Sequence, residues 1–265
     1  MKADRSGVAI LGVYVTDLAF RAARQPRMGE TLLGSAFAIG PGGKGSNQAV
    51  AAARVGAAVT FVTRVGEDAF GRMARELWQR EGITARTMPT PTATGAAYIF
   101  LDERTGENAI IIYPGAAGEI GPGDIDAAAP DIGAARVFLT QLEQPIPAAL
   151  RALEIARAAG VTTILNPAPA APLPDAILPL CDYLTPNESE AAAITGLAVT
   201  GPETARRAAE ALLSRGARAA LITLGEQGAL LGTPRECHHV PAYRAGPVVE
   251  TTGAGDAFNG AFAAA

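Results

Sequence analysis

The stretch GPGGKGSNQAVAAARVGAAVTFVTRV, residues 40–65, joins a glycine cluster, a helical pattern and a strand-like run with almost no spacer. Its alanine-rich middle, residues 45–55, predicts a helix, and the β-branched run at residues 59–65 predicts a buried strand. A helix followed at once by a strand is the repeating unit of α/β proteins. This stretch therefore sets a fold class with which the rest of the chain can be compared.

The same alternation continues along the chain. Strands that alternate with helices of about 10–15 residues indicate βαβ units. We therefore expect an α/β fold of three αβα layers, with a mainly parallel central sheet and helices on both faces. The other predicted strands are residues 8–15, 136–142, 162–165, 183–185 and 219–223, and the other predicted helices are residues 68–80, 147–159, 188–195, 202–214 and 256–265.

Two regions interrupt this alternation. Residues 30–39 are strand-like and run into the glycine cluster, and residues 94–101 and 108–113 flank DERTGE, a plausible hairpin turn. We interpret them as a small β-sheet lid, with strands from about 30–40 and 94–113, on a single domain that covers residues 1–265. The alternative is that they are edge strands of the main sheet.

Composition narrows the class of protein. The chain has 265 residues, of which 49% are hydrophobic, and a net charge of −4. It has no basic excess to bind nucleic acid, and no apolar run approaches the roughly 20 residues of a membrane helix. The start, MKADRSG, does not resemble a signal peptide. Two cysteines, Cys181 and Cys237, fit a reducing compartment. We expect a cytoplasmic protein.

The glycine cluster resembles two familiar phosphate-binding motifs. A P-loop that ends at Lys44 would need a glycine where Ala38 stands, and Ser or Thr where Gly45 stands. The G-x-G-x-x-G spelling of a dinucleotide-binding turn is present, but an earlier strand already precedes it, and the acids Glu67 and Asp68 look like a helix start. Both motifs are disfavoured.

A second glycine cluster lies near the C-terminus, in ETTGAGDAFNGAF, residues 250–262. Gly253, Ala254 and Gly255 lead directly into the last predicted helix, and backbone N–H groups at such a turn form an anion hole. Asp256 stands in the first turn, where it either only favours the helix N-terminus or serves as a base. Phosphoryl transfer to an alcohol needs both a base and an anion hole.

The two glycine-rich segments, taken together, resemble the sequence signatures of a known protein family. GGKGSNQAVAAARVGA (residues 42–57) and TTGAGDAFNGAF (residues 251–262) resemble the two signatures of the ribokinase-like (PfkB) carbohydrate kinases. LNPAPA, TPNESEA and ITLGEQG fall between them in that family's order. The resemblance covers the whole chain. It implies a kinase that transfers the γ-phosphoryl of ATP, with Mg²⁺, to the 5-hydroxyl of a sugar, most simply D-ribose, and a homodimer formed through the lid.

The resemblance also implies a role for individual residues. Asp256 matches the general base, and Gly253, Ala254 and Gly255 match the anion hole. The matches to sugar-binding positions are Asp17, Gly43, Lys44, Asn47, Glu143 and Asp256 itself. The matches to nucleotide-binding positions are Asn187, Glu190, Thr223, Gly225, Gly228 and Gly255, with Glu190 holding Mg²⁺ through water. Glu250 and Thr252 match ligands of an activating monovalent cation, K⁺.

Three departures from the family bear on these roles. Tyr14 stands where a sugar-contacting asparagine is common, so we expect it to change the size of the sugar pocket. Glu250 replaces the usual aspartate before TTGAGD. The chain ends at Ala265, inside the last predicted helix, so we expect impaired ATP binding and stability of this chain alone. The alternatives are a kinase for another substrate, such as fructose, 2-keto-3-deoxygluconate or adenosine, and a sugar-binding protein without catalysis.

Overall fold

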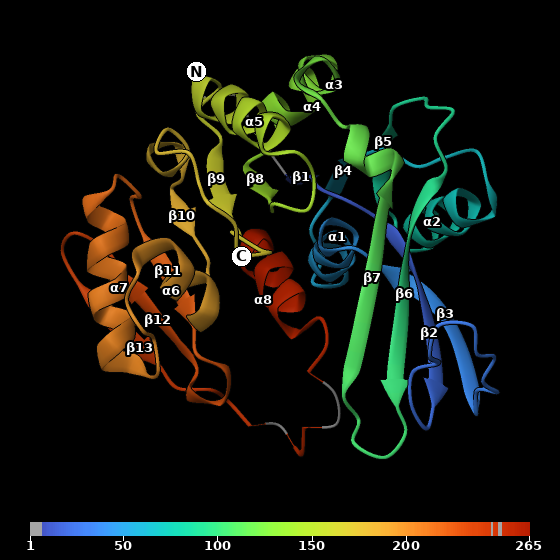
Figure 1. Ribbon diagram of the computed structural model, residues 1–265. Coiled ribbons are helices and arrows are strands. Elements are labelled where there is room, and N and C mark those ends of the chain that lie inside the picture. Colours follow the sequence, from blue (N-terminus) through green and yellow to red (C-terminus); the bar gives the residue numbers. More distant parts are fainter. Residues whose placement is uncertain (1–6, 245, 249–250) are drawn as a thin grey trace.

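The computed structural model describes residues 7–244, 246–248 and 251–265. Its largest element is a nine-stranded sheet in the order β13-β12-β11-β10-β9-β8-β1-β4-β5 (Figure 1). The strands are β1 (Val8–Leu11), β4 (Val59–Thr63), β5 (Thr84–Thr87), β8 (Val137–Thr140), β9 (Thr162–Leu165), β10 (Tyr183–Leu184), β11 (Ala220–Thr223), β12 (Ala229–Gly232) and β13 (Cys237–Val240).

The sheet is parallel from β5 to β11, and β12 and β13 continue it in antiparallel pairs. The predicted mainly parallel sheet is therefore confirmed. Helices cover both faces. The helices are α1 (Lys44–Arg54), α2 (Ala69–Arg80), α3 (Pro122–Ala127), α4 (Ala129–Ala134), α5 (Ile146–Ala158), α6 (Glu188–Thr195), α7 (Pro202–Ser214) and α8 (Ala254–Ala264).

Two hydrophobic cores fill the space between the layers. One lies between the sheet and α1, α2 and α8, with Trp78, Tyr14 and Phe61 as its largest buried side chains. The other lies on the opposite face, under α3, α4, α5, α6 and α7, where alanines such as Ala152 and Ala208 let the helices approach the sheet. Strand side chains alternate between the cores, since Ile10 enters the first and Leu11 the second. The three αβα layers are thus present.

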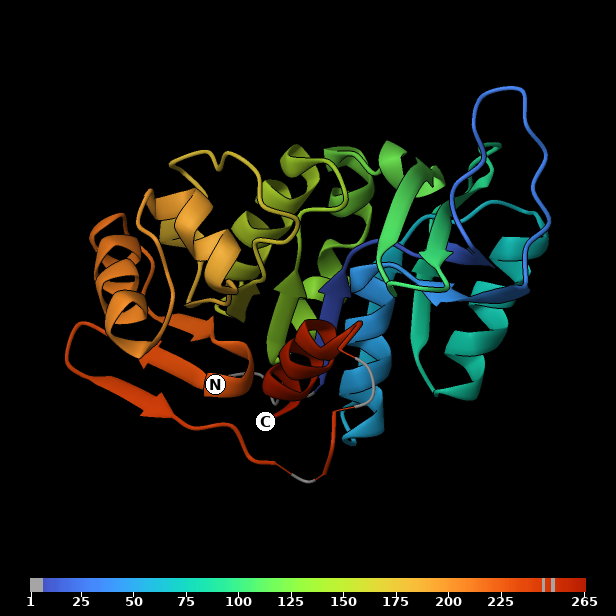
Figure 2. The same cartoon turned by 60° about the horizontal axis from the view of Figure 1, so that its bottom comes forward.

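A second, four-stranded sheet stands beside the main one, in the order β3-β2-β6-β7 (Figures 1 and 2). It contains the two strand-like segments at 94–101 and 108–113, so the alternative of edge strands on the main sheet is wrong. Its strands are β2 (Val15–Ala22), β3 (Ala36–Gly42), β6 (Thr94–Asp102) and β7 (Asn108–Gly115).

The predicted strand at residues 8–15 is wrong in one respect. The main sheet keeps only Val8–Leu11, and the chain then crosses at Gly12 to enter the small sheet as β2. The crossing is possible because Gly12 has no side chain, for its Cβ would lie 2.6 Å from the Cα of Gly45 at the start of α1. Asp17, five residues beyond Gly12, therefore belongs to the small sheet.

No helix in the described part of the chain combines the length and apolar character needed to cross a membrane.

Candidate active site

Helix α8 begins where the chain takes a left-handed turn. Gly253 caps the helix with φ of 76°, in the region that favours glycine. N–H groups in the first turn have no partner within the helix, and the helix dipole adds positive potential there. The N–H of Ala254 is turned back to the carbonyl oxygen of Thr251, at 3.1 Å. Asp256 lies in this first turn and is only 7% exposed, so a buried carboxylate stands at the N-terminus of this helix.

Two amides from α1 hold the carboxylate of Asp256. Asn47 donates to Oδ2 at 3.0 Å, and Gln48 donates to Oδ1 at 3.1 Å. The contact requires the two helices to lie close together. They do so at Gly260, where an added Cβ would stand 2.7 Å from the Cβ of Ala51 (Figure 2). Each oxygen of the carboxylate therefore has one fixed donor.

In the glycine cluster before α1, the backbone lies directly against a second carboxylate, that of Asp17. The carboxylate of Asp17 lies against Gly42, where a Cβ would overlap it. Gly43 caps α1 with φ of 88°, and its Cβ would stand 2.6 Å from the carbonyl oxygen of Val13. Burial raises the pKa of Asp17. A side chain at position 42 would fill the space beside Asp17, and one at position 43 would collide with the backbone of Val13 and Tyr14.

A third carboxylate is tied to the start of α1. The backbone N–H of Lys44 donates to Oε2 of Glu143 at 2.7 Å. Burial is the largest cause of a raised pKa for Glu143; the charges of Asp256 and Asp17 raise it further, while Lys44 opposes the shift. The loop after β8, the start of α1, β2 and α8 thus place three acids and one lysine around the same space.

The residues Asn187 and Glu190 form the N-terminus of α6. Asn187 Oδ1 accepts from the backbone N–H of Glu190 at 2.8 Å, and Glu190 Oε2 accepts from that of Asn187 at 2.9 Å. This is a complete capping box. Glu190 is 7% exposed and burial raises its pKa, which Lys44 partly offsets. The cap occupies only one of its two carboxylate oxygens among the described contacts.

The loop that contains Thr223, Gly225 and Gly228 lies beside this helix. The N–H of Thr223 donates to the carbonyl oxygen of Pro186 at 3.0 Å, and the chain pairs there with Asn187. Gly225 and Gly228 have φ of 53° and 94°, so both positions favour glycine. The loops after β8, β10 and β11 therefore meet at the carboxyl edge of the parallel sheet, where open α/β sheets bind their ligands.

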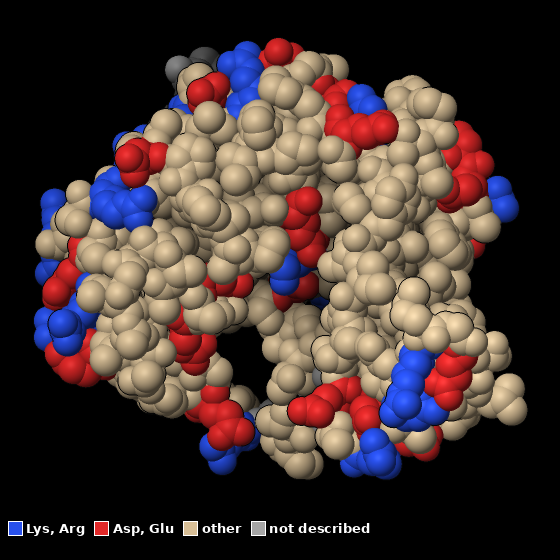
Figure 3. Space-filling model, viewed as in Figure 1, with Lys and Arg blue, Asp and Glu red and all other residues tan. Residues whose placement is uncertain are grey.

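The face of the molecule at this edge is hollowed. In Figure 3, acidic and basic side chains gather in the hollow at the middle of the view, between the parts built on the two sheets. A pocket of about 440 Å³ opens between α1 and the start of α8. Its lining includes Asp17, Asn47, Thr252 and Gly253, from β2, α1 and the start of α8. Residues 200 positions apart in the sequence thus border one space.

The model of one protein family, described as pfkB family carbohydrate kinase, matches residues 6–265. The chain belongs to the pfkB family of carbohydrate kinases. It is therefore a phosphotransferase with an alcohol group as the acceptor.

Relatives of this kinase include ribokinases. A ribokinase from Staphylococcus aureus is 41% identical over 258 residues, which cover 96% of this chain and 84% of that protein. A deoxyribokinase from Salmonella typhi is 39% identical over 259 residues, covering 97% and 84%. The chain spans about half, 48%, of a bifunctional ribokinase/ribose-5-phosphate isomerase A from Fructilactobacillus sanfranciscensis, at 39% identity.

Solved structures have the same fold. The structure of Arabidopsis thaliana ribokinase complexed with ribose and ATP superposes on this kinase with a TM-score of 0.89 and 30% sequence identity. The superposition covers 98% of this chain and 85% of that one.

The structure corrects the role that the sequence suggested for Tyr14. Its side chain is 1% exposed, packs edge-on against Trp78 and accepts a hydrogen bond from Thr16 at 3.2 Å. The aromatic ring therefore fills the core of the kinase instead of changing the size of the sugar pocket.

Two further sequence-based inferences can be compared with the structure. Asp68 is the N-cap of α2 and accepts from the N–H of Gly71 at 2.8 Å, as expected of a helix start rather than a ribose-binding acid. Glu250 lies outside the described residues, so its assignment to a cation site stays a prediction.

Sequence reasoning missed a chain of buried amides beneath Asp256. Gln48, Gln141 and Asn166 are linked by hydrogen bonds, and Asn166 leads on to Thr185 and Asn259. All five are at most 6% exposed. One signal was available: Gln48 is a polar residue at a core-facing position of an otherwise alanine-rich helix.

Proposed function

We propose that this kinase transfers the γ-phosphoryl of ATP to the 5-hydroxyl of D-ribose and releases D-ribose 5-phosphate and ADP. The observation that carries this proposal is the Asp256 carboxylate, buried at a helix N-terminus and held by two amides. The choice of ribose as the substrate is supported by the 41% identity to a ribokinase and by the fold shared with a ribokinase that was solved with ribose and ATP.

In this proposal Asp256 is the general base. It accepts the proton of the sugar hydroxyl as the hydroxyl oxygen forms its bond to the γ-phosphorus. The bond between the γ-phosphorus and the bridging oxygen breaks, and its electrons leave with ADP. The backbone of Gly253, Ala254 and Gly255 and the dipole of α8 stabilise the negative charge of the transferring group.

The sugar lies, in our proposal, among the side chains that surround Asp256. Asp17 and Glu143 accept from sugar hydroxyls, while Lys44 and Asn47 donate to sugar oxygens, and Gly43 leaves room for close approach. A buried sugar needs all its hydroxyls paired, so a cluster of carboxylates and an amide suits a polyol better than an apolar ligand.

The nucleotide is proposed to lie along the loops after β10 and β11, near Asn187, Thr223, Gly225 and Gly228, with Gly255 at its phosphates. Magnesium usually keeps several waters and is held by few carboxylates and by phosphate oxygens. Glu190 fits such a role, because its cap uses only Oε2 among the described contacts and Oε1 is left for a water of the ion. When bound, Mg²⁺ would neutralise charge on the phosphates.

Two finer features belong to the same proposal. Thr252 and Glu250 would give oxygens to an activating K⁺ ion beside the anion hole. A cytoplasmic location fits the two free thiols of Cys181 and Cys237.

The small sheet is proposed to be a lid that excludes water and also a dimer interface. Strand register gives it two faces, of which one contains Asp17. The opposite face is aromatic and aliphatic, and its rings pack on one another. The ring centroids of Phe20 and Phe37, for example, are 4.8 Å apart. Exposed apolar faces of this kind mark interaction sites. The residues of this face are Phe20, Phe37, Ile39, Tyr98 and Ile111.

A second candidate substrate is 2-deoxy-D-ribose, because a deoxyribokinase is 39% identical. The two sugars differ in one hydroxyl. A site built to pair that hydroxyl rejects the sugar that lacks it, because the site's own polar groups are then left unpaired.

The test is a coupled ADP-release assay on the full chain with ATP and Mg²⁺, with and without K⁺. The acceptors are D-ribose, 2-deoxy-D-ribose, fructose, 2-keto-3-deoxygluconate and adenosine. We expect the highest kcat/KM for D-ribose, by about tenfold or more. A higher value for another acceptor would reassign the substrate, and sugar binding without ADP release from any acceptor would favour a non-catalytic protein.

A further inference from the structure

The amide of Gln48 connects the Asp256 carboxylate to the interior of the protein. Its Nε2 donates to Asp256 Oδ1 and to Asn166 Oδ1, each at 3.1 Å. Its Oε1 accepts from Nε2 of Gln141. Gln48 and Gln141 are both 0% exposed, so neither amide is in contact with bulk solvent.

The direction of each hydrogen bond in this series of buried amides is determined by the groups at the two ends of the series. An ionised Asp256 can only accept, and the backbone carbonyl oxygen of Thr185, which accepts from Asn166 Nδ2 at 2.9 Å, can also only accept. Gln48 must therefore turn its NH₂ toward Asp256 and Asn166, and its oxygen toward Gln141. Rotation of this amide by half a turn would break all three contacts.

A buried amide is a costly way to fill a core. Burying a polar group is unfavourable unless all its hydrogen bonds are made, and an apolar side chain of similar volume would pack without that requirement. The neighbouring core positions of α1, Ala49 and Ala52, are indeed apolar. Gln48 thus departs from these alanines, and its amide donates to Asp256.

We propose that Gln48 is a positioning residue for phosphoryl transfer: it fixes the plane of the Asp256 carboxylate, and Gln141 fixes Gln48. This inference rests on the proposed role of Asp256 as the base. The terminal torsion of an aspartate is otherwise broad. Asn47, the donor to the other oxygen, is only partly buried and is shared with the proposed sugar site, whereas Gln48 is fully enclosed.

The variant Gln48→Met tests the inference, since methionine has a similar length and no donor. We expect kcat to fall about ten- to a hundredfold, because a small misplacement of a reacting group has effects of that size. The KM for D-ribose and its Kd by calorimetry should stay within about threefold. Kinetics are measured together with a thermal melt of each protein.

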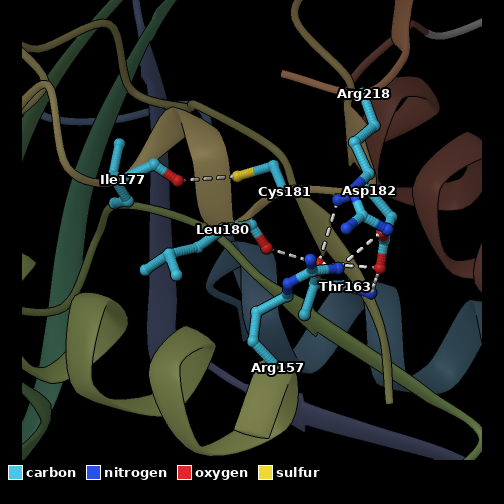
Figure 4. A network of polar contacts seen from close by, with 7 residues as sticks. All are labelled: Arg157, Thr163, Ile177, Leu180, Cys181, Asp182 and Arg218. Carbon is cyan, nitrogen blue, oxygen red and sulfur yellow. Dashed lines mark hydrogen bonds and ion pairs between the residues drawn. The ribbon is translucent and has the colours of Figure 1, made fainter. Parts of the chain in front are cut away.

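The matched control is Thr163→Val, which breaks a buried polar cluster at the other end of the sheet. Thr163 is 0% exposed, donates to the carbonyl oxygen of Leu180 at 2.6 Å and contacts Asp182, which also pairs with Arg157 and Arg218 (Figure 4). It lies at the amino end of β9, whereas Asn166 directly follows the carboxyl end of that strand. We expect a lower melting temperature and a kcat within about twofold of the wild type.

The outcomes separate this inference from the proposed function. A kcat of Gln48→Met within about twofold of the wild type, a raised KM with unchanged kcat, or an equal loss in Thr163→Val would each overturn the positioning role. If Gln48→Met does not fold, Gln141→Met decides: a several-fold loss of kcat at unchanged KM supports the role, and an unchanged kcat overturns it. Near-normal turnover by Asp256→Asn would instead reject the base itself.

Discussion

Gly260 of α8 lies directly against the backbone carbonyl oxygen of Gln48 in α1, so closely that a Cβ atom at position 260 would overlap that oxygen. The same added atom would stand 2.9 Å from the backbone nitrogen of Ala52. Backbone cannot move aside as the end of a flexible side chain can. The approach of the two helices, and with it the contact between Gln48 and Asp256, depends on the absence of a side chain at this position.

The variant Gly260→Ala should therefore push α8 away from α1. We expect a loss of stability of about 1–3 kcal/mol, typical of overpacking, and a lower kcat because Asp256 moves with its helix. Urea unfolding and steady-state kinetics measure the two effects. Gly123→Ala in α3 is the matched control, since its Cβ would meet no atom within 4 Å; it should be neutral or stabilising by up to about 1 kcal/mol. Equal behaviour of the two variants would contradict the prediction.

Removal of the proposed base should abolish turnover while leaving the sugar bound. For Asp256→Asn we expect kcat to fall about 10²- to 10⁴-fold, the usual contribution of a general base, with the Kd for D-ribose changed little. Kinetics and calorimetry provide the two numbers. Asp68→Asn is the control, because Asn caps a helix as well as Asp does, and its activity should be unchanged. Retained turnover in Asp256→Asn would end the assignment.

The raised pKa of Glu143 predicts a pH-dependent cost to stability. The folded protein keeps a proton on this carboxyl that the unfolded chain releases above its ordinary pKa of 4.5, so the free energy of unfolding falls as pH rises from there through the raised value. Glu143→Gln keeps an acceptor for Lys44 but removes the buried charge. We expect this variant to be more stable than the wild type at pH 8, equally stable at pH 4, and weaker in sugar binding.

Glu30 provides a control of opposite sign for that experiment. Hydrogen bonds from Arg24 lower its pKa to about 2, so its charge contributes stability above its unfolded pKa, and this is lost as pH falls toward about 2. Glu30→Gln should therefore not gain stability at pH 8. A similar gain in both variants would show that charge reduction in general, and not burial of Glu143, is responsible.

The capping box of α6 allows the cap and the proposed metal role of Glu190 to be separated. Glu190→Gln keeps an oxygen for the N–H of Asn187, so the melting temperature should not fall. The loss of charge should raise the Mg²⁺ concentration needed for half activity by about tenfold, equivalent to about 1.4 kcal/mol. Glu188→Gln, in the same helical turn, should leave this concentration unchanged. An unaltered Mg²⁺ response in Glu190→Gln would remove this residue from the metal site.

The apolar face of the small sheet predicts a homodimer. Ile111 is 70% exposed at the centre of β7, and Ile111→Glu should place unpaired charges in the interface and dissociate it. Size-exclusion chromatography with light scattering measures the mass. Val55→Glu is the control, since Val55 is 59% exposed at the end of α1, away from this face. A monomeric wild type, or a dimer that survives Ile111→Glu, would contradict the prediction.

Much of the main sheet could be predicted from local patterns. Helices α6 and α7 and strand β9 occupy the predicted residues 188–195, 202–214 and 162–165 without change, because each has clear start or stop signals such as Asn187, Pro202 or Gly160. The first strand was predicted too long, because an apolar run does not show where a chain leaves one sheet for another. Strands β12 and β13 were missed because they are antiparallel additions that lie outside the alternation of strand and helix.

The candidate site was predictable only where a motif reports it. Asp256, Asn47 and Glu143 were found through signatures, and the structure brings them to one hollow. Tyr14 was misjudged because its packing partner, Trp78, is distant in the sequence. Gln48 and Gln141 were missed because they are 93 positions apart in the sequence, and only the folded structure shows the hydrogen bond between them.

The crossing of the chain at Gly12 places two acids of the candidate site on different sheets. Asp17 is carried by the small sheet and Glu143 by the main one, and their charges disfavour each other across the gap. In our proposal one sugar hydroxyl donates a hydrogen bond to each carboxylate, so the bound sugar bridges the two acids. Only a molecule long enough to contact both acids would connect the two sheets. The distance between the two carboxylates would therefore select substrates by their length.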